Sequence, residues 1–164
     1  MSDGVVSVVW LAPLFTNAGG AEIVVGVTPA AEWYLQLDSP IRFTSTTFHP
    51  SILPLVQPNY GGDYATARSL LSDRLTHAGL PASLADSFPY FAVIQTAFRS
   101  SGFWARHAVE WLPHVEFDEA FARILLQFTS DKQRSQADRH LVAKHLHCSQ
   151  GWNNIPRQHD TAPA

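Results

Sequence analysis

The chain has 164 residues, of which 46% are hydrophobic and 15% are charged, and its formal net charge at pH 7 is −3. This length suits one ordinary domain with a single hydrophobic core and is short for two domains. The negative charge argues against a protein that binds nucleic acid or an anionic membrane surface, because such proteins are usually basic.

The scarcity of charge predicts a protein partner. Charged residues make up about 25% of a typical soluble domain, so the surface of this chain must be unusually neutral. Charge normally keeps an uncovered surface solvated. We therefore expect part of the surface to be covered by another protein, in a hetero-complex or in a homo-oligomer.

Two features predict the compartment. The single cysteine, Cys148, cannot form an internal disulfide, which favours a reducing environment. The apolar run at residues 5–11 follows Asp3 instead of the lysine or arginine that begins a secretory leader, and it is too short to span a bilayer. We expect a cytoplasmic protein that does not insert into a membrane.

The first fifty residues have the composition of β-strands. Residues 5–15 and 21–27 are rich in β-branched and aromatic side chains, and the sequence TNAGG between them tolerates a positive φ, which predicts a hairpin. Apolar and polar residues alternate through 33–38 and again through 41–44, which predicts two further strands. Together these segments predict an antiparallel meander of about four strands with one wetter face.

Residues 49–62, HPSILPLVQPNYGG, contain three prolines and two closing glycines and predict a long irregular connection. No charged residue occurs between Arg42 and Asp63, so full exposure of this span to solvent would be unfavourable. We expect it either to pack on the helices or to meet a partner, because irregular connections often present the aromatic anchors of interfaces. The residues predicted to bind the partner are Phe48, His49, Leu53, Leu55 and Tyr60.

Helical periodicity begins after Asp63, which is positioned to cap a first helix that Gly79 ends. A second helix is predicted over residues 88–98, with Ser87 as its cap. This second segment is apolar on every side, so we expect it to be the most buried helix of the chain.

Three further helices are predicted. One covers residues 103–112 and is expected to stop at Pro113, which cannot donate a backbone hydrogen bond. A second of these helices starts near Asp118. Residues 130–133 are expected to interrupt the helical pattern and to provide an N-cap for the final helix. Strands first and helices afterwards predict an α+β fold with four to five helices packed on one face of the sheet.

The domain boundaries follow from composition. Residues 1–150 are expected to form one α+β domain. Residues 151–164 contain two prolines and mostly polar side chains, so we expect a loosely ordered tail.

An acid–base pair is one interpretation of residues 102–114. His107 and Glu110 lie one helical turn apart, and a histidine held beside a carboxylate can act as a general acid and base. Trp104 and Trp111 belong to an apolar arc that is typical of a core-facing helix, and this competing interpretation is favoured. His107 and Glu110 are the only candidate catalytic residues.

Residues 131–148, DKQRSQADRHLVAKHLHC, contain three histidines and the cysteine. On a helix, His140 and His147 lie about 10 Å apart along the axis, which is too far for both to bind one ion. His145 and Cys148 could share an ion, but no further thiol or carboxylate stands nearby in sequence to complete a tetrahedron. We therefore predict a solvated amphipathic helix, with no metal and no cofactor.

No motif in the sequence names a reaction, since it contains no nucleophile elbow, zinc-protease helix or paired CxxC. The order of strands and helices in a neutral, aromatic-rich chain is similar to that of many bacterial immunity and accessory proteins. We therefore expect a cytoplasmic protein that binds another protein, for example a bacterial immunity-type protein that neutralises a toxin. We expect no nucleic-acid or membrane partner. The alternative is a small hydrolase or transferase that uses His107 and Glu110.

Overall fold

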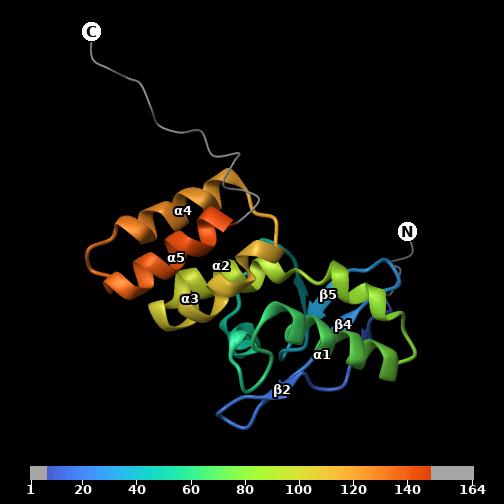
Figure 1. The fold of residues 1–164 in the computed structure, drawn as a ribbon. Helices are drawn as coiled ribbons and strands as arrows, with labels where there is room; N and C mark the ends of the chain where they lie inside the picture. The colour runs from blue at the N-terminus through green and yellow to red at the C-terminus, as the bar shows by residue number, and fades with distance from the viewer. Residues whose placement is uncertain (1–6, 149–164) are drawn as a thin grey trace. The chain divides into compact units, whose positions relative to one another are not determined.

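The computed structural model describes residues 7–148 (Figure 1). The chain divides into two compact units, the first ending at Trp111 and the second starting at Leu112. Strands followed by helices confirm the predicted α+β class. A single domain over residues 1–150 stays a prediction, and the tail predicted at residues 151–164 lies outside the described residues.

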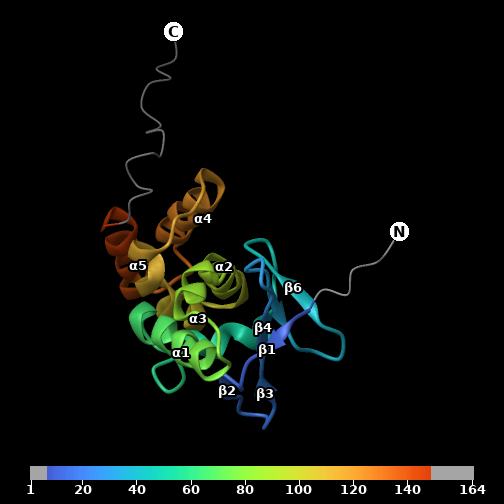
Figure 2. The same ribbon diagram turned by 90° about the vertical axis from the view of Figure 1, so that its right-hand side faces the viewer.

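The strands of the first unit form the predicted antiparallel meander. The four-stranded sheet has the order β1-β4-β5-β6, with β1 at Val9–Trp10, β4 at Val25–Val27, β5 at Trp33–Leu35 and β6 at Ile41–Phe43. A ribbon of β2 (Phe15–Thr16) and β3 (Glu22–Ile23) continues the hairpin of β1 and β4 (Figure 2). The turn of this hairpin lies in the TNAGG sequence, as predicted.

Strand pairing places the large apolar side chains of the sheet on one face. Trp33 lies opposite Val27 on one neighbouring strand and opposite Phe43 on the other, and all three are buried. The rings of Trp33 and Phe43 also contact Phe88, at centroid distances of 5.1 and 5.4 Å. Arg42 lies on the opposite face of β6 and is exposed, in agreement with the predicted wetter face.

The predicted irregular connection is a compact helical segment. Residues Pro50–Val56 form a 3-10 helix, η1, which His49 caps by accepting a hydrogen bond from the backbone N–H of Ser51. Pro50 stands in the first turn of η1, where its missing N–H would have no helical partner, and Pro54 lies inside the segment. The buried residues of η1 are Ile52, Leu53, Leu55 and Val56. The segment therefore packs into the core of its own unit.

Gly61 holds the end of this connection against the backbone of η1. A Cβ atom at position 61 would lie 2.1 Å from the carbonyl oxygen of Leu55. Backbone cannot move away as a flexible side chain can, so Gly61→Ala should lower the free energy of unfolding by about 3 kcal/mol, the upper part of the range for overpacking. Urea denaturation measures this loss.

A matched control for that substitution is Gly19→Ala in the exposed β2–β3 turn. A Cβ atom at position 19 would meet only the side-chain oxygen of Asn17, at 3.3 Å. We expect the control to change stability by about 0.5 kcal/mol or less, as for most surface substitutions. Equal losses in the two variants would contradict the close approach at Gly61.

Helix α1 (Tyr64–His77) begins and ends as predicted. The side chain of Asp63 accepts a hydrogen bond from the backbone N–H of Thr66 at 2.8 Å, which satisfies one of the unpaired donors of the first turn. Gly79 follows the helix with a φ of +74°, a conformation that glycine adopts without steric cost. The buried residues of α1 are Ala67, Leu71 and Leu75.

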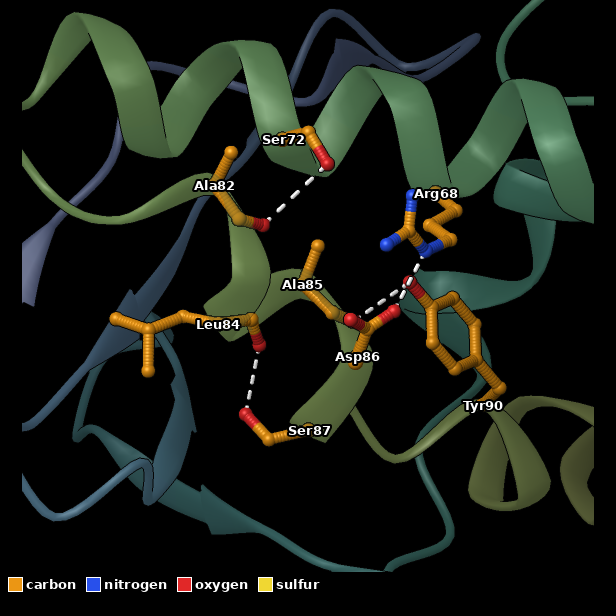
Figure 3. Close-up of polar contacts among 8 residues, drawn as sticks. All are labelled: Arg68, Ser72, Ala82, Leu84, Ala85, Asp86, Ser87 and Tyr90. Carbon is orange, nitrogen blue, oxygen red and sulfur yellow. Dashed lines mark hydrogen bonds and ion pairs between the residues drawn. The ribbon is translucent and has the colours of Figure 1, made fainter.

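A short 3-10 helix, η2 (Ala82–Ser87), follows α1 and packs along it. Figure 3 shows two contacts between these elements. Nε of Arg68 donates to Asp86 at 2.6 Å, and the hydroxyl of Ser72 donates to the carbonyl of Ala82 at 3.5 Å. These contacts position η2, whose last residue precedes Phe88 in the core.

Helix α2 (Tyr90–Ser100) starts two residues later than predicted. Ser87 does not cap it, because its hydroxyl donates to the carbonyl of Leu84 and accepts from the indole N–H of Trp33 at 2.9 Å. Pro89 takes the N-cap position without a side-chain hydrogen bond. The buried residues of α2 are Tyr90, Ala92, Val93, Ile94, Thr96, Ala97 and Phe98. Within residues 7–148 no other helix buries as many, which confirms the prediction of the most buried helix.

Helix α3 (Gly102–Ala108) is shorter than predicted. Ser101, in an extended conformation, separates it from α2. From Val109 the chain continues as a 3-10 helix, η3 (Val109–His114), which includes Pro113. The prediction that one α-helix runs up to Pro113 was therefore wrong, because the chain changes to a tighter helix before the proline.

The second unit contains a helical hairpin of α4 (Glu119–Ser130) and α5 (Gln136–Cys148). Helix α4 begins after Asp118, as predicted, and the Asp118 side chain accepts a hydrogen bond from a backbone N–H of the first turn. The side chain of Ser135 does the same for α5, in place of a residue of the predicted break. Among residues 7–148, no helix combines the length and the hydropathy needed to cross a bilayer.

Candidate functional site

The residues predicted to bind a partner are divided between the surface and the core of the first unit. Phe48 is 47% exposed, whereas Leu53 and Leu55 are 1% and 0% exposed. The assignment of these two leucines to a partner surface needs correction, since in this conformation they offer no contact area. The reason is that η1 folds their side chains inward. Partner binding itself stays a prediction, and Phe48 is the predicted residue best placed for it.

His49 and Tyr60 are half-buried and contact other residues of the first unit. Nδ1 of His49 lies 2.6 Å from the hydroxyl oxygen of Ser51, within hydrogen-bond distance. The ring of Tyr60 packs against that of Phe15, with centroids 5.2 Å apart. Both residues therefore help to hold the connection in place while keeping part of their surface accessible.

An open cavity of about 540 Å³ lies beside the sheet of the first unit. Its walls come from the β4–β5 turn and the start of β5, from β6 and the residues after it, and from the end of η2 with the residue that precedes α2. The lining includes Ala31, Glu32, Arg42, Thr44, Ser45 and Ser87. A backbone hydrogen bond from Thr47 to Thr44 closes the turn after β6, and Phe48 directly follows this turn. The exposed ring and one wall of the cavity therefore belong to the same short segment.

Several polar side chains of the cavity already have partners within the first unit. Arg42 and Glu32 form an ion pair at 2.5 Å, in which both side chains are partly exposed. The Ser87 hydroxyl donates to a carbonyl and accepts from Trp33, so its proton is not directed at a base. Among the described lining residues there is no nucleophile with an adjacent general base.

The backbone at the rim of this cavity is strained. Ala31 has a φ of 61°, in the left-handed region that glycine usually occupies. Backbone hydrogen bonds between Thr28 and Glu32 and between Ala31 and Thr28 hold the turn in this shape. Such a conformation costs about 1 kcal/mol or more for a residue other than glycine, and strain of this kind is concentrated at binding sites. This edge of the sheet therefore combines a strained backbone with an open cavity.

The shifted pKa values of the first unit are near η2 and have structural causes (Figure 3). The hydrogen bond from Arg68 lowers the pKa of the Asp86 carboxyl. Burial raises the pKa of Tyr90, whose hydroxyl donates to the carbonyl of Ala85 at 2.8 Å. Burial also raises the pKa of Tyr64, whose ring packs on that of Tyr90 at 4.8 Å. Both phenols therefore keep their protons at neutral pH and support the packing.

The predicted acid–base pair is not assembled. His107 is half-buried on α3 and Glu110 is exposed in η3. No hydrogen bond or ion pair joins these two side chains in the described part of the chain. The ring of His107 instead contacts Phe103, with centroids 5.0 Å apart. A hydrolase or transferase site at His107 and Glu110 stays a prediction without a supporting contact.

Helix α5 has the amphipathic character that its sequence predicts. Val142 and Leu146 are buried, whereas His140, Lys144 and His147 are exposed. Within residues 7–148, no three His, Cys, Asp or Glu side chains come together in a group that could hold a metal ion. His140 and His147 therefore lie on the exposed side of the helix, whereas His145 is half-buried.

Two surface features were not predicted from the sequence. The first is the exposure of Phe103 on α3, for which a signal existed. Phe103 and His107 are four residues apart, so they share one side of a helix, and Ala105 and Ala108 lie on the other side. A helical-wheel projection of the sequence separates these two sides. The second is the cavity, for which no local signal exists because its walls come from distant segments of the chain.

No protein-family model, curated protein or solved structure matches the chain.

Proposed function

We propose that this chain is a cytoplasmic protein-binding protein that receives its partner at the cavity of the first unit, beside Phe48. The observation that carries the proposal is the 47% exposure of Phe48, directly after the turn whose residue Thr44 lines the cavity. Aromatic side chains dominate the energy of many protein interfaces, and their partners often insert an anchor into an adjacent pocket. An exposed ring three residues after a segment that lines an open cavity supports this mode of binding.

The rim of the cavity favours recognition of a polar protein surface. The ion pair between Arg42 and Glu32 is exposed, so it contributes only about 0–1 kcal/mol to the stability of the fold. A partner can therefore replace this pair with contacts of its own at little cost to folding. The scarcity of charged residues, 15% of the chain, also fits a protein whose surface is partly covered.

The specific form that we propose is a bacterial immunity-type protein that neutralises a toxin. Its support is the order of strands and helices and the lack of a nucleophile–base pair among the described cavity residues. If this form is correct, co-expression should protect cells from the cognate toxin, and Phe48→Asp should remove the protection.

Affinity capture of the full chain from its native cells tests partner binding directly. Phe48→Asp should reduce the recovered partner about tenfold or more, because loss of an aromatic interface anchor commonly exceeds 1.4 kcal/mol. Quantitative mass spectrometry measures the recovery, and circular dichroism establishes that the variant is folded.

The matched control is Phe103→Asp, which places the same charge on the other exposed phenylalanine of the first unit. This variant should recover the partner as well as the unmodified chain does. Equal recovery with Phe48→Asp, Phe103→Asp and the unmodified chain would overturn the proposal.

A further inference from the structure

The turn that follows β6 lies against the free edge of that strand. β6 is the last strand in the order β1-β4-β5-β6, so one of its two sides has no neighbouring strand (Figure 2). An edge strand with unpaired backbone N–H and C=O groups is a template to which another chain can add a strand. Whether β6 can accept such a strand depends on the groups that face its free edge and on their partners.

The backbone groups of Arg42 and Thr44 face this free edge. In an antiparallel pair, only every second residue directs its backbone groups at the partner strand. Gln36 donates a backbone hydrogen bond to Val24, beside β4, so Tyr34, two residues earlier, also directs its groups at β4. Arg42 lies opposite Tyr34 in the pairing of β5 with β6. The N–H and C=O groups of Arg42, and those of Thr44 two residues later, therefore point away from β5.

Thr47 provides hydrogen bonds to three of these four groups. Its backbone N–H donates to the carbonyl of Thr44 at 3.0 Å. Its hydroxyl donates to the carbonyl of Arg42 at 3.1 Å and accepts from the backbone N–H of Thr44 at 2.9 Å. The hydroxyl of Thr44, at 3.2 Å, supplies a second donor. A hydroxyl has one proton and two lone pairs, so these contacts use the whole hydrogen-bonding capacity of the Thr47 side chain.

We propose that residues 44–47 close the edge of β6 against strand addition by another chain, and that the Thr47 hydroxyl keeps this edge closed. Thr47 supplies the donors and the acceptor that an added strand would supply, so a strand can pair here only after it displaces Thr47. Pro40 before β6 and the exposed charge of Arg42 act in the same direction, because proline and charge at an edge disfavour pairing.

Hydrogen exchange of the Thr44 amide tests the closed state. Thr47→Val replaces the hydroxyl by a methyl group of similar size at a half-buried position and keeps the backbone N–H. The Thr44 amide loses its acceptor, so it should exchange about fivefold faster or more, the factor that one hydrogen bond of ordinary strength contributes. Thr47→Ala should give the same result. NMR spectroscopy measures the exchange rate.

Two matched controls belong to this experiment. Thr47→Ser keeps the hydroxyl, so its Thr44 amide should exchange as slowly as in the unmodified chain. Thr46→Val removes an exposed hydroxyl of the same turn that contacts only the side chain of Thr44, and it should also leave the exchange rate unchanged.

Sedimentation velocity of the purified full chain measures the consequence for association. Thr47→Val frees the carbonyl of Arg42 and the N–H of Thr44, so its self-association constant should exceed that of the unmodified chain about tenfold or more. The further change Thr44→Pro removes the freed N–H and should return the association to the level of the unmodified chain. Circular dichroism establishes that each variant is folded.

Three outcomes would overturn the proposal. Unchanged exchange at Thr44 in Thr47→Val would show that the hydroxyl does not hold the turn. Faster exchange without stronger association, or association that persists with Thr44→Pro, would show that the edge of β6 is not the surface that the turn closes. The experiment needs no partner protein, so its result is independent of the capture experiment with Phe48→Asp.

Discussion

Leu55→Asp is expected to unfold the first unit of the protein at room temperature. Leu55 is completely buried in η1. Truncating a buried leucine costs about 2 to 5 kcal/mol, and burying a carboxylate without a partner adds several kcal/mol more. The sum is comparable with the whole stability of a typical domain, about 5 to 15 kcal/mol. Far-UV circular dichroism and urea denaturation measure the loss.

Phe48→Asp is the matched control for this substitution, because it introduces the same charge seven positions earlier at an exposed side chain. We expect its unfolding midpoint to stay close to that of the unmodified chain. The two variants should differ because Leu55 is a core residue, whereas the side chain of Phe48 is exposed. A folded Leu55→Asp variant with an unchanged midpoint would contradict the position of η1.

Ile94→Ala is expected to lower the free energy of unfolding by about 2 to 5 kcal/mol, the range for large-to-small substitutions in a packed core. Ile94 is completely buried on α2, so the lost methyl groups leave a cavity that the neighbouring side chains only partly fill. Urea denaturation measures the change, and the backbone amides of α2 should exchange slowly with solvent.

The control on the same helix is Gln95→Ala, at a half-buried polar position that follows Ile94 directly. Alanine keeps the helix propensity high there, so the change should stay below about 1 kcal/mol. Equal losses for Ile94→Ala and Gln95→Ala, or rapid exchange across α2, would contradict the assignment of α2 as the most buried helix.

The elements that were predicted correctly are those specified by local chemistry. Asp63 and Asp118 cap their helices because an aspartate side chain satisfies backbone donors only two or three residues away. The TNAGG turn likewise depends on its own residues. The cap predicted at Ser87 failed for the opposite reason, since its hydroxyl accepts a hydrogen bond from Trp33, 54 positions away in the chain.

The candidate sites were less predictable than the fold. From its sequence, the proline-rich connection could either pack on the helices or meet a partner. Contacts with distant parts of the chain bury its leucines and leave Phe48 exposed. His107 and Glu110 have the spacing of an acid–base pair, but the ring of His107 packs against Phe103. Spacing along a helix shows which side chains share a face, whereas the partner of each side chain depends on its surroundings in space.

The sequence by itself determined the α+β class, the meander, the most buried helix and the scarcity of charge, because hydrophobic periodicity and capping act over a few residues. Only the tertiary structure decided which apolar residues remain exposed and where a cavity opens. The walls of that cavity come from the β4–β5 turn, from β6 and from the end of η2 with the residue that precedes α2, and no local sequence pattern predicts that these segments meet. Burial and cavities arise from packing between segments distant in sequence, so they appear only when the whole chain has folded.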